Sequence, residues 1–291
     1  MKPIVKWAGG KTQLLEHIET MLPTTAKCIG KTAPFLDQMI PSHFVNYFEP
    51  FLGGGAVLLK LAPESATVND INTELINMYR QVKENPYAVI DELARLDYEH
   101  EMVSDVKHYY YYVREMFNLY LGQSSPQQAA RLIYLNKHCF NGLYRVNSHG
   151  LFNVPFNNKK SGNSFDTENI LRISAYLQKV NILNVDFEEA VADAKAGDFV
   201  FFDSPYVPLN PTSFTDYTKE GFGYEEHLRL ARLYKRLSEQ GVYCMLTNHN
   251  TELVNELYKD FHIKVVQVSR NINSNASARK GEEVIITNYE L

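Results

Sequence analysis

The sequence predicts an α/β fold, a mainly parallel sheet of about seven strands that is interrupted once by a mainly helical insertion. Two observations lead to this prediction. Short apolar runs alternate with helical hydrophobic patterns over most of the 291 residues, an order typical of strands joined by crossover helices. Between about residues 86 and 177 this alternation stops, and the patterns there are helical or loop-like.

Strands are expected where short apolar runs stand between turn signals, at 44–48, 66–69, 181–185, 199–202, 242–246, 263–268 and 283–288. Apolar residues at helical spacing predict helices over 56–61, 72–82, 187–194, 224–239 and 251–258. The insertion follows the second strand. We therefore expect two domains, one formed by 1–85 together with 166–291 and one formed by 86–165.

The composition is that of an ordinary globular protein. Hydrophobic residues make up 45% and charged residues 22% of the chain, which excludes a disordered, collagen-like or coiled-coil protein. Three glycines and Lys60 interrupt the longest apolar stretch, Phe51 to Ala62, so no membrane span is expected. The segment Met1 to Trp7 has no apolar signal-peptide core.

The cysteines are three in number, lie far apart and form no C-x-x-C pair: Cys28, Cys139 and Cys244. This pattern argues against a disulfide framework and against a zinc site, because both need cysteines in close or paired spacing. We expect a reducing cytoplasm and no bound metal. No feature of the sequence indicates an obligate protein partner.

The formal net charge of −5 hides an uneven distribution. The segment Met116 to Phe165 has five basic residues and no acid, and Phe261 to Gly281 has four basic residues and no acid. These segments carry +5 and +4, so the rest of the chain carries −14. Because local positive surface attracts a phosphate backbone, the distribution favours a polyanionic partner.

A glycine-rich turn follows the first predicted strand, in Glu49-Pro50-Phe51-Leu52-Gly53-Gly54-Gly55. Glycines permit positive φ and let a ligand approach the backbone, while the following helix offers free N–H groups. Asp70 stands 17 residues after Gly53, at the end of the next strand, where a carboxylate commonly binds ribose hydroxyls. The pattern favours a nucleoside cofactor and leaves NAD, FAD and S-adenosylmethionine open.

A second turn, Lys6-Trp7-Ala8-Gly9-Gly10-Lys11-Thr12, resembles the end of a P-loop. A P-loop needs another glycine five residues before Gly10, where this chain has Val5, so the spacing excludes a P-loop NTPase. The turn instead brings Trp7 and Lys11 together, an indole to cover an organic ligand and a cation for its carboxylate.

The segment Asp203-Ser204-Pro205-Tyr206 follows a buried strand, at 199–202. Ligands of open α/β sheets gather at the carboxyl ends of strands. Asp203 and the Ser204 carbonyl supply two acceptors beside the flat ring of Tyr206, which suits an exocyclic amine on a stacked base. The same residues are also common in plain strand-end turns, so the tetrapeptide alone does not decide.

With three further blocks, these segments resemble Dam-type DNA adenine N6-methyltransferases. The six blocks follow that family's α-group order: Lys6–Lys11, Glu49–Gly55, Asn69–Asn72, Phe140–Arg145, Phe152–Phe156 and Asp203–Tyr206. The resemblance implies a Rossmann-like methyltransferase sheet that binds S-adenosylmethionine. In it, 1–85 and 166–291 form the catalytic domain and 86–165 the helical DNA target-recognition domain. It further implies methylation of adenine N6 in duplex DNA, in this subgroup usually within GATC.

Carried over position by position, the resemblance assigns cofactor contacts to Trp7, Lys11, Glu49, Phe51, Gly53, Asp70, Asp186, Phe187 and Asp203. It assigns DNA contacts to Lys6, Phe140, Asn141, Leu143, Arg145 and Pro155. In the family, the loop matched by 140–145 enters the DNA. The resemblance implies that Phe140 wedges into the base stack and that Arg145 reads guanine through O6 and N7. Leu143 and Pro155 would contact thymine methyl groups.

The catalytic residues are expected to be Asp203, Ser204, Pro205 and Tyr206. The family's turn is usually Asp-Pro-Pro-Tyr, so Ser204 is a departure that preserves the backbone carbonyl. We expect Asp203 and that carbonyl to accept the two N6 hydrogens of a flipped adenine, with Tyr206 stacked on the base.

A basic segment between the last two predicted strands supplies two further candidates, Arg279 and Lys280, for contacts with phosphates. The interpretation as a whole is a cytoplasmic DNA methyltransferase encoded by a bacterium or phage, of the kind found in restriction-modification systems. The residues leave open another acceptor (adenine in RNA or cytosine N4), a non-catalytic DNA-binding protein and a nicotinamide oxidoreductase.

Overall fold

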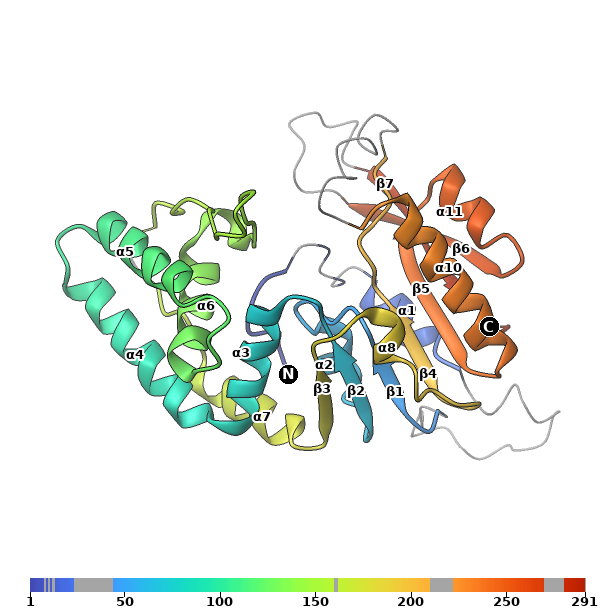
Figure 1. Cartoon of the computed structure of the whole chain (residues 1–291), viewed down its shortest axis with the longest axis horizontal. Coiled ribbons are helices and arrows are strands. Elements are labelled where there is room, and N and C mark those ends of the chain that lie inside the picture. The colour runs from blue at the N-terminus through green and yellow to red at the C-terminus, as the bar shows by residue number, and fades with distance from the viewer. Residues whose placement is uncertain are drawn as a thin grey trace. The chain divides into compact units, whose positions relative to one another are not determined.

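The structure, a computed structural model, describes residues 1–7, 9, 11, 14–23, 44–159, 162–209, 222–269 and 280–290. Seven strands form one sheet in the order β3-β2-β1-β4-β5-β7-β6 (Figure 1). They are β1 (Tyr47–Glu49), β2 (Ala66–Asn69), β3 (Val180–Leu183), β4 (Phe199–Phe202), β5 (Tyr243–His249), β6 (His262–Ser269) and β7 (Lys280–Thr287). Each predicted strand overlaps one of these, and the predicted α/β fold with about seven strands is confirmed.

Helices connect most of the strands and make up the insertion. They are α1 (Leu15–Thr20), α2 (Ala56–Leu61), α3 (Thr73–Glu84), α4 (Pro86–Met102), α5 (Val106–Leu119), α6 (Pro126–His138), the 3-10 helix η2 (Phe140–Gly142), α7 (Thr167–Leu177), α8 (Phe187–Ala190), α10 (Tyr224–Glu239) and α11 (Glu252–Leu257). The sequence did not predict α1, and α8 is shorter than the predicted helix over 187–194. No helix in the described ranges is long and apolar enough to cross a membrane.

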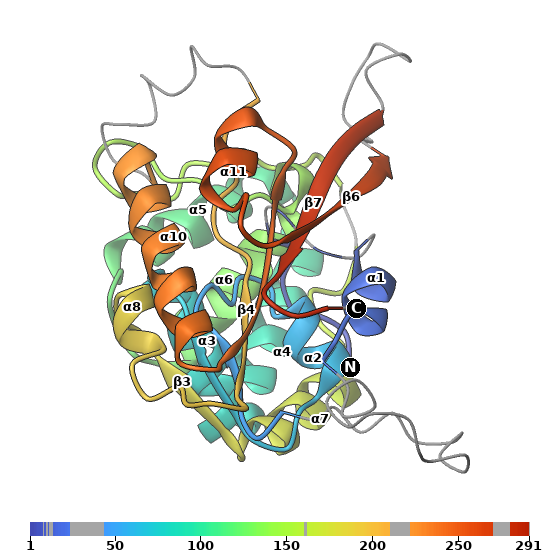
Figure 2. The same ribbon diagram turned by 90° about the vertical axis from the view of Figure 1, so that its right-hand side faces the viewer.

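The C-terminal part of the sheet departs from the expected parallel arrangement. β4 pairs in parallel with β1 and β5, whereas β7 runs antiparallel to both β5 and β6. Figure 2 shows β6 and β7 side by side. Parallel neighbours need a long crossover, usually a helix, and no helical pattern separates these last two strands. β7 is thus the antiparallel strand in a sheet that the sequence predicts to be mainly parallel.

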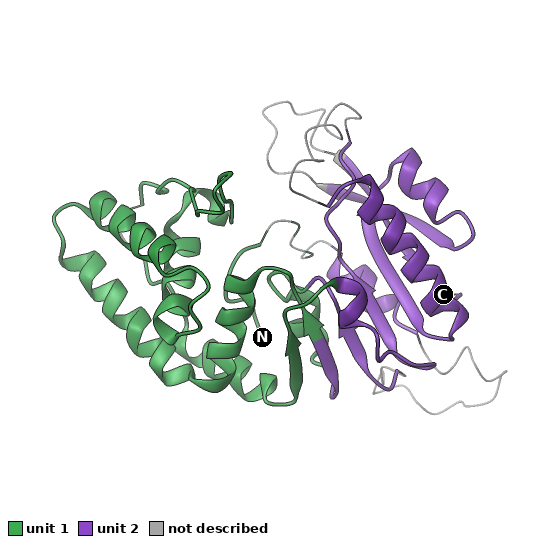
Figure 3. Cartoon of the chain, viewed as in Figure 1, with its two compact units in different colours: residues 1–12, 52–62, 68–186 green, residues 13–51, 63–67, 187–291 purple. Residues whose placement is uncertain are grey.

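The chain divides into two compact units (Figure 3). Unit 1 comprises residues 1–12, 52–62 and 68–186, and unit 2 comprises 13–51, 63–67 and 187–291. In unit 1, α6 packs on α3, α4 and α5. Its core includes four fully buried aromatic side chains: Tyr79, Tyr110, Phe117 and Tyr134. Aromatic side chains bury more apolar surface per residue than most other types.

The core of unit 2 forms where α10 packs on the sheet. All four residues of β4 are buried, and two of them, Val200 and Phe202, belong to one apolar cluster with three leucines of α10: Leu230, Leu233 and Leu237. Tyr234 is also buried there, and its hydroxyl donates to the Cys244 carbonyl at 2.9 Å. Burial of each such side chain contributes about 1.5–3 kcal/mol, which fixes β4 and the turn that follows it.

Polar side chains begin three helices of unit 1. Each accepts a hydrogen bond from a backbone N–H in the first turn: Asp105 for α5, Ser125 for α6 and Asp166 for α7. Proline occupies the first position of α4 and α6, where the missing N–H costs nothing. Such caps contribute about 1 kcal/mol each, so local sequence sets where these helices start.

Candidate functional site

Two of the predicted segments, the one after β1 and the one after β4, begin at the carboxyl ends of neighbouring central strands in unit 2. β1 and β4 are adjacent and parallel, with Tyr47 opposite Phe199 and Phe48 opposite Val200. In the strand order the chain proceeds from β1 toward β2 and from β4 toward β5, so this pair is a topological switch point. Ligands of open α/β sheets bind at the carboxyl ends of such strands.

The segment after β1 contributes a buried acid and an aromatic ring. Glu49 is buried and its Oε2 accepts a hydrogen bond from the Tyr47 hydroxyl at 2.8 Å. The ring of Phe51 lies 5.4 Å from that of Phe187 and 5.6 Å, edge-on, from that of Phe222. The sequence predicted Phe51 and Phe187 but not Phe222. The three rings form an apolar cluster of the kind that packs on a flat heteroaromatic group.

The turn after β4 is held by hydrogen bonds from β5. The Thr247 hydroxyl donates to Asp203 Oδ1 at 3.0 Å. The Val207 N–H donates to Asn248 Oδ1 at 2.9 Å, and the His249 Nδ1 lies 2.8 Å from the Val207 carbonyl. The carboxylate of Asp203 is thus oriented by a buried hydroxyl, and the backbone beyond it is fixed at two atoms. The sequence analysis missed all three β5 residues.

Tyr206 is held at both its hydroxyl and its ring. The hydroxyl donates to Glu283 Oε2 at 3.1 Å, and the ring meets His249 edge-on at 4.8 Å. Burial, with the nearby Asp203 and Glu283 charges, holds the pKa of Tyr206 well above 10, so the phenol stays protonated and remains a donor. Glu283 on β7 is a further contributor that the sequence analysis did not identify.

Ser204 differs from its neighbours because its hydroxyl has no hydrogen-bond partner among the described residues. The residue is 2% exposed, and a buried hydroxyl without a partner costs free energy. Pro205, next along the chain, is exposed.

The glycine turn after β1 and the carboxylate of Asp70 are in contact within unit 1. The Gly53 N–H donates to Asp70 Oδ2 at 2.9 Å, and the Asn72 N–H donates to Asp70 Oδ1 at 2.9 Å. Burial raises the pKa of Asp70, and these two bonds act in the opposite direction. Gly53 has φ +51°, and a Cβ there would lie 3.0 Å from Cδ1 of Trp7. The carboxylate therefore shapes the turn, and each of its oxygens keeps a second lone pair for a ligand.

Three other predicted cofactor residues have defined environments. Trp7 is half-buried beside the Gly53 turn. Lys11 is buried, and its Nζ donates to the Gly9 carbonyl at 2.5 Å. Asp186 is half-buried and directly precedes α8.

The predicted DNA-contacting residues of the insertion come together on one loop, residues 139–156. Isolated antiparallel bridges join Cys139 to Phe156 and Val146 to Phe152, which closes the loop into a hairpin-like shape. Its exposed residues include the predicted ones: Phe140, Asn141, Leu143, Arg145 and Pro155. Phe140 is 52% exposed, unusual for a phenylalanine without a partner surface.

Hydrogen bonds within this loop orient its cation. Arg145 Nε donates to Asn153 Oδ1 at 2.7 Å, and its Nη2 lies 3.4 Å from the Asn153 carbonyl. The Asn153 N–H donates in turn to the Arg145 carbonyl at 3.1 Å. The guanidinium is thus fixed at one edge, which reduces the entropy lost when its other N–H groups bind a ligand.

Lys6 is tied to the same loop through the buried side chain of Asn136. The Lys6 N–H donates to Asn136 Oδ1 at 2.8 Å. Asn136 Nδ2 donates to the Lys6 carbonyl at 2.8 Å and to the Gly142 carbonyl at 3.1 Å. Gly142 has φ +67°, and a Cβ there would lie 2.7 Å from Cδ of Lys6. The N-terminal segment and the loop are therefore joined, although 130 residues separate Lys6 from Asn136.

The predicted phosphate contacts at the C-terminal end lie outside this description. Arg279 is not among the described residues, and Lys280 is the first residue of β7, where only the backbone is described.

Known proteins resemble the chain over nearly its whole length. Residues 7–272 match the family described as D12 class N6 adenine-specific DNA methyltransferase. The chain is 42% identical to the Type II methyltransferase M1.LlaDCHI of Lactococcus lactis, covering 99% of this chain and 96% of the relative. It is 40% identical to the Type II methyltransferase M.MjaIII of Methanocaldococcus jannaschii, covering 99% of each. It is 32% identical to the DNA adenine methylase of Haemophilus influenzae, covering 98% and 92%.

Proposed function

Because the chain belongs to the D12 class of N6 adenine-specific DNA methyltransferases, we propose that it methylates adenine N6 within GATC sites of duplex DNA, with S-adenosylmethionine as donor. Membership of this family favours adenine in DNA as the acceptor over adenine in RNA or cytosine N4, which the sequence alone left open. The observation that supports the site assignment best is the turn from Asp203 to Val207, which β5 fixes at the carboxyl end of β4. The names of the Type II relatives support a place in a restriction-modification system, in the cytoplasm where the DNA is.

The target amine is a poor nucleophile, because its lone pair is delocalised into the purine ring. In a duplex the base is also paired and stacked, so it is flipped out at a cost of a few kcal/mol. Asp203 and the Ser204 carbonyl then accept the two N6 hydrogens, which localises the lone pair and orients it for in-line attack. Tyr206 supplies a ring for the base to pack against. Orientation of this kind supplies much of the barrier reduction, and the proton leaves N6 through Asp203 or to water.

The donor supplies an electrophilic methyl group when bound. The residues present fit it, because a Cβ at Gly53 would lie 3.0 Å from the Trp7 indole, and the partly buried rings of Phe51 and Phe222 pack against the buried Phe187. From the family resemblance, we assign donor contacts to Trp7, Gly53 and Asp70, and Lys11 would neutralise the carboxylate group of the donor. The remaining assigned contacts are Glu49, Phe51, Asp186, Phe187 and Asp203.

We assign recognition of the DNA sequence to the exposed loop of residues 139–156. We assign the wedge to Phe140, the guanine contact to Arg145, and thymine methyl contacts to Leu143 and Pro155. Asn141 and Lys6 complete the interface. Residues 86–165 therefore act as the target-recognition domain in this proposal, and 1–85 with 166–291 as the catalytic domain.

The proposal is tested by incubating genomic DNA with the protein and labelled S-adenosylmethionine, then mapping each modified base and its sequence context. The expected product is N6-methyladenine confined to GATC. Methyl groups on cytosine would contradict the proposed acceptor, and methyl groups on adenines outside GATC would contradict the proposed recognition site. Absence of any transfer would indicate a DNA-binding protein without catalysis.

Substitution of Ser204 by alanine is expected to stabilise the protein by about 1 kcal/mol, because a buried hydroxyl without a partner costs free energy. Methyl transfer is expected to stay within about threefold, because the proposed acceptor is the backbone carbonyl. Denaturant unfolding and initial rates measure the two effects. A destabilised Ser204→Ala protein would mean that the hydroxyl has a partner in solution.

Replacing Arg279 and Lys280 together with alanine is expected to flatten the salt dependence of duplex binding. Each lost phosphate contact reduces the slope of log K against log salt by about 0.9, so the double variant should lose about 1.8. Binding titrations at several salt concentrations measure the slope. An unchanged slope would remove both residues from the interface.

A further inference from the structure

One residue of the loop joins it to the glycine turn. The ring of Tyr144 stacks on the Trp7 indole, with centroids 4.9 Å apart and planes 25° from parallel. Trp7 packs in turn against Gly53, where an added Cβ would lie 3.0 Å from the indole. Two rings therefore connect the loop that carries Arg145 to the turn that Asp70 holds.

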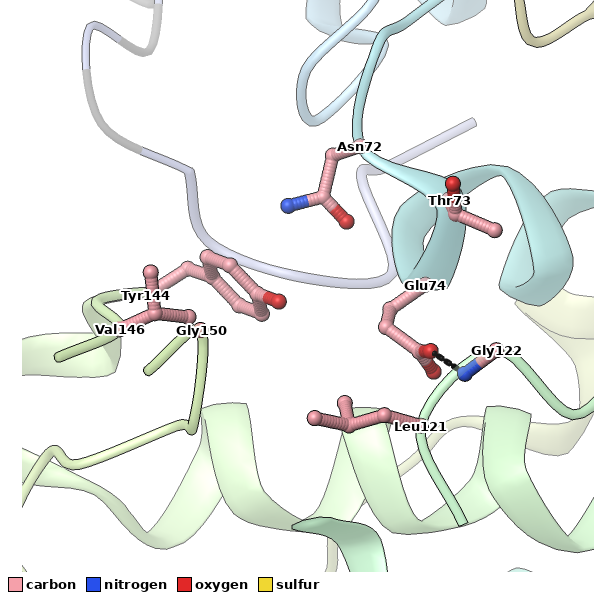
Figure 4. Close-up of a pocket in the computed structure, with 8 residues that line it drawn as sticks. All are labelled: Asn72, Thr73, Glu74, Leu121, Gly122, Tyr144, Val146 and Gly150. Carbon is pink, nitrogen blue, oxygen red and sulfur yellow. Dashed lines mark hydrogen bonds between the residues drawn. The ribbon is translucent and has the colours of Figure 1, made fainter. Parts of the chain in front are cut away.

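Tyr144 has a second connection to the same turn. It lines a pocket of about 480 Å³ together with Asn72, Thr73, Glu74 and Leu121. In Figure 4 the phenol points across this pocket toward α3, where Asn72 and Glu74 project from the start of the helix. Asn72 caps α3 by accepting from the Leu75 N–H at 2.9 Å, and its own N–H donates to Asp70.

Tyr144 has further contacts within the loop and with Asn72. Its ring also lies 5.6 Å from the ring of Phe152, which is buried in the loop. Burial raises the pKa of Tyr144, and an interaction with Asn72 opposes that rise. The base of the loop is fixed by Asn136, which bonds both Lys6 and Gly142. Tyr144 is thus packed directly on the indole, and the base of the loop is bonded to the segment that carries Trp7.

We propose that Tyr144 is a positioning residue that couples donor binding to DNA reading. Ordering of Trp7 by a ligand on the glycine turn orders Tyr144, and with it the neighbouring Leu143 and Arg145. By thermodynamic linkage, DNA bound to the loop strengthens donor binding by the same factor. The inference rests on the proposed function, because it takes the ligand of the turn to be the donor and the ligand of the loop to be DNA.

The coupling is measured with S-adenosylhomocysteine as a non-reacting probe. Its Kd is determined with and without saturating GATC duplex, for the wild type and for Tyr144→Leu, Tyr144→Met and Tyr144→Phe. We expect the duplex to tighten probe binding by about fivefold or more in the wild type. Tyr144→Phe keeps the stacked ring and should retain most of this factor. Tyr144→Leu and Tyr144→Met lack the ring and should reduce it to about one.

Trp7 gives an independent readout, because it is the single tryptophan of the chain. Adding duplex without the probe should change its emission in the wild type and in Tyr144→Phe. It should leave the emission unchanged in the two variants without a ring. Tyr112→Leu is the matched control, since Tyr112 lies on α5 and is 51% exposed. It should behave as the wild type in both measurements.

The two possible failures are distinguishable. If the wild type methylates GATC duplex but shows no coupling, or if the ring-free variants keep the full factor, the role of Tyr144 is wrong and the proposed function stands. If the wild type transfers no methyl group to any DNA, the proposed function fails and the inference fails with it. Tyr144→Met fills more of the space than leucine, so the test holds even if Tyr144→Leu does not fold.

Discussion

Asp203→Asn is expected to lower the methyl-transfer rate by about 10²- to 10³-fold, the range found when one preorganised electrostatic contact is removed. The amide oxygen can still accept from Thr247, so the turn should keep its position. The amide nitrogen would then face the N6 hydrogens of adenine, a donor opposite donors. Single-turnover rates with saturating cofactor and duplex isolate this effect from binding.

The control for Asp203→Asn is Asp193→Asn, the same exchange at an exposed carboxylate of unit 2. It should retain the wild-type rate. Melting temperatures of both proteins exclude unfolding as the cause. A single-turnover rate within about threefold of wild type for Asp203→Asn would show that the carboxylate does not hold the amine.

Arg145→Ala is expected to remove discrimination at the guanine of GATC, worth about 1–3 kcal/mol for a bidentate contact. The sharpest substrate is a duplex with 7-deazaguanine in both strands of the site, which lacks the N7 acceptor. Wild-type kcat/KM should fall on this duplex. The Arg145→Ala enzyme should treat both duplexes alike, because the contact is already absent.

Two further variants separate base reading from charge. Arg172→Ala removes an exposed guanidinium from α7 in the same unit and should leave discrimination intact. Arg145→Lys keeps the charge without the planar fork and should retain duplex affinity while losing most of the discrimination. If Arg145→Ala still distinguished the two duplexes by the wild-type ratio, another residue would read this base.

The sequence predicted the strands because each is a short apolar run bounded by turn residues, as at 66–69 and 199–202. It missed the antiparallel β7, because an apolar run does not report the direction of its partner. It also missed α1, a short helix of six residues. Packing decides these features, and packing depends on residues far away in the chain.

The sequence points to candidate site residues where a single segment carries them, as in the turn at 203–206 and the glycine turn. It does not point to them where distant segments cooperate. Thr247 follows an apolar run within β5, and only the register of that strand against β4 brings it to Asp203. Tyr144 and Trp7 are separated by most of unit 1, and no local pattern signals that they stack. For the β5 residues, the sequence offered one sign, the polar segment Thr247-Asn248-His249 that directly follows the apolar run of the strand.

The placement of the target base is tested most directly by a structure of the protein with GATC duplex and a non-reactive donor analogue. We expect an adenine outside the helix, with N6 within hydrogen-bond distance of both an Asp203 oxygen and the Ser204 carbonyl, and its ring against Tyr206. An adenine left stacked in the duplex, or bound elsewhere with N6 away from these acceptors, would contradict this placement.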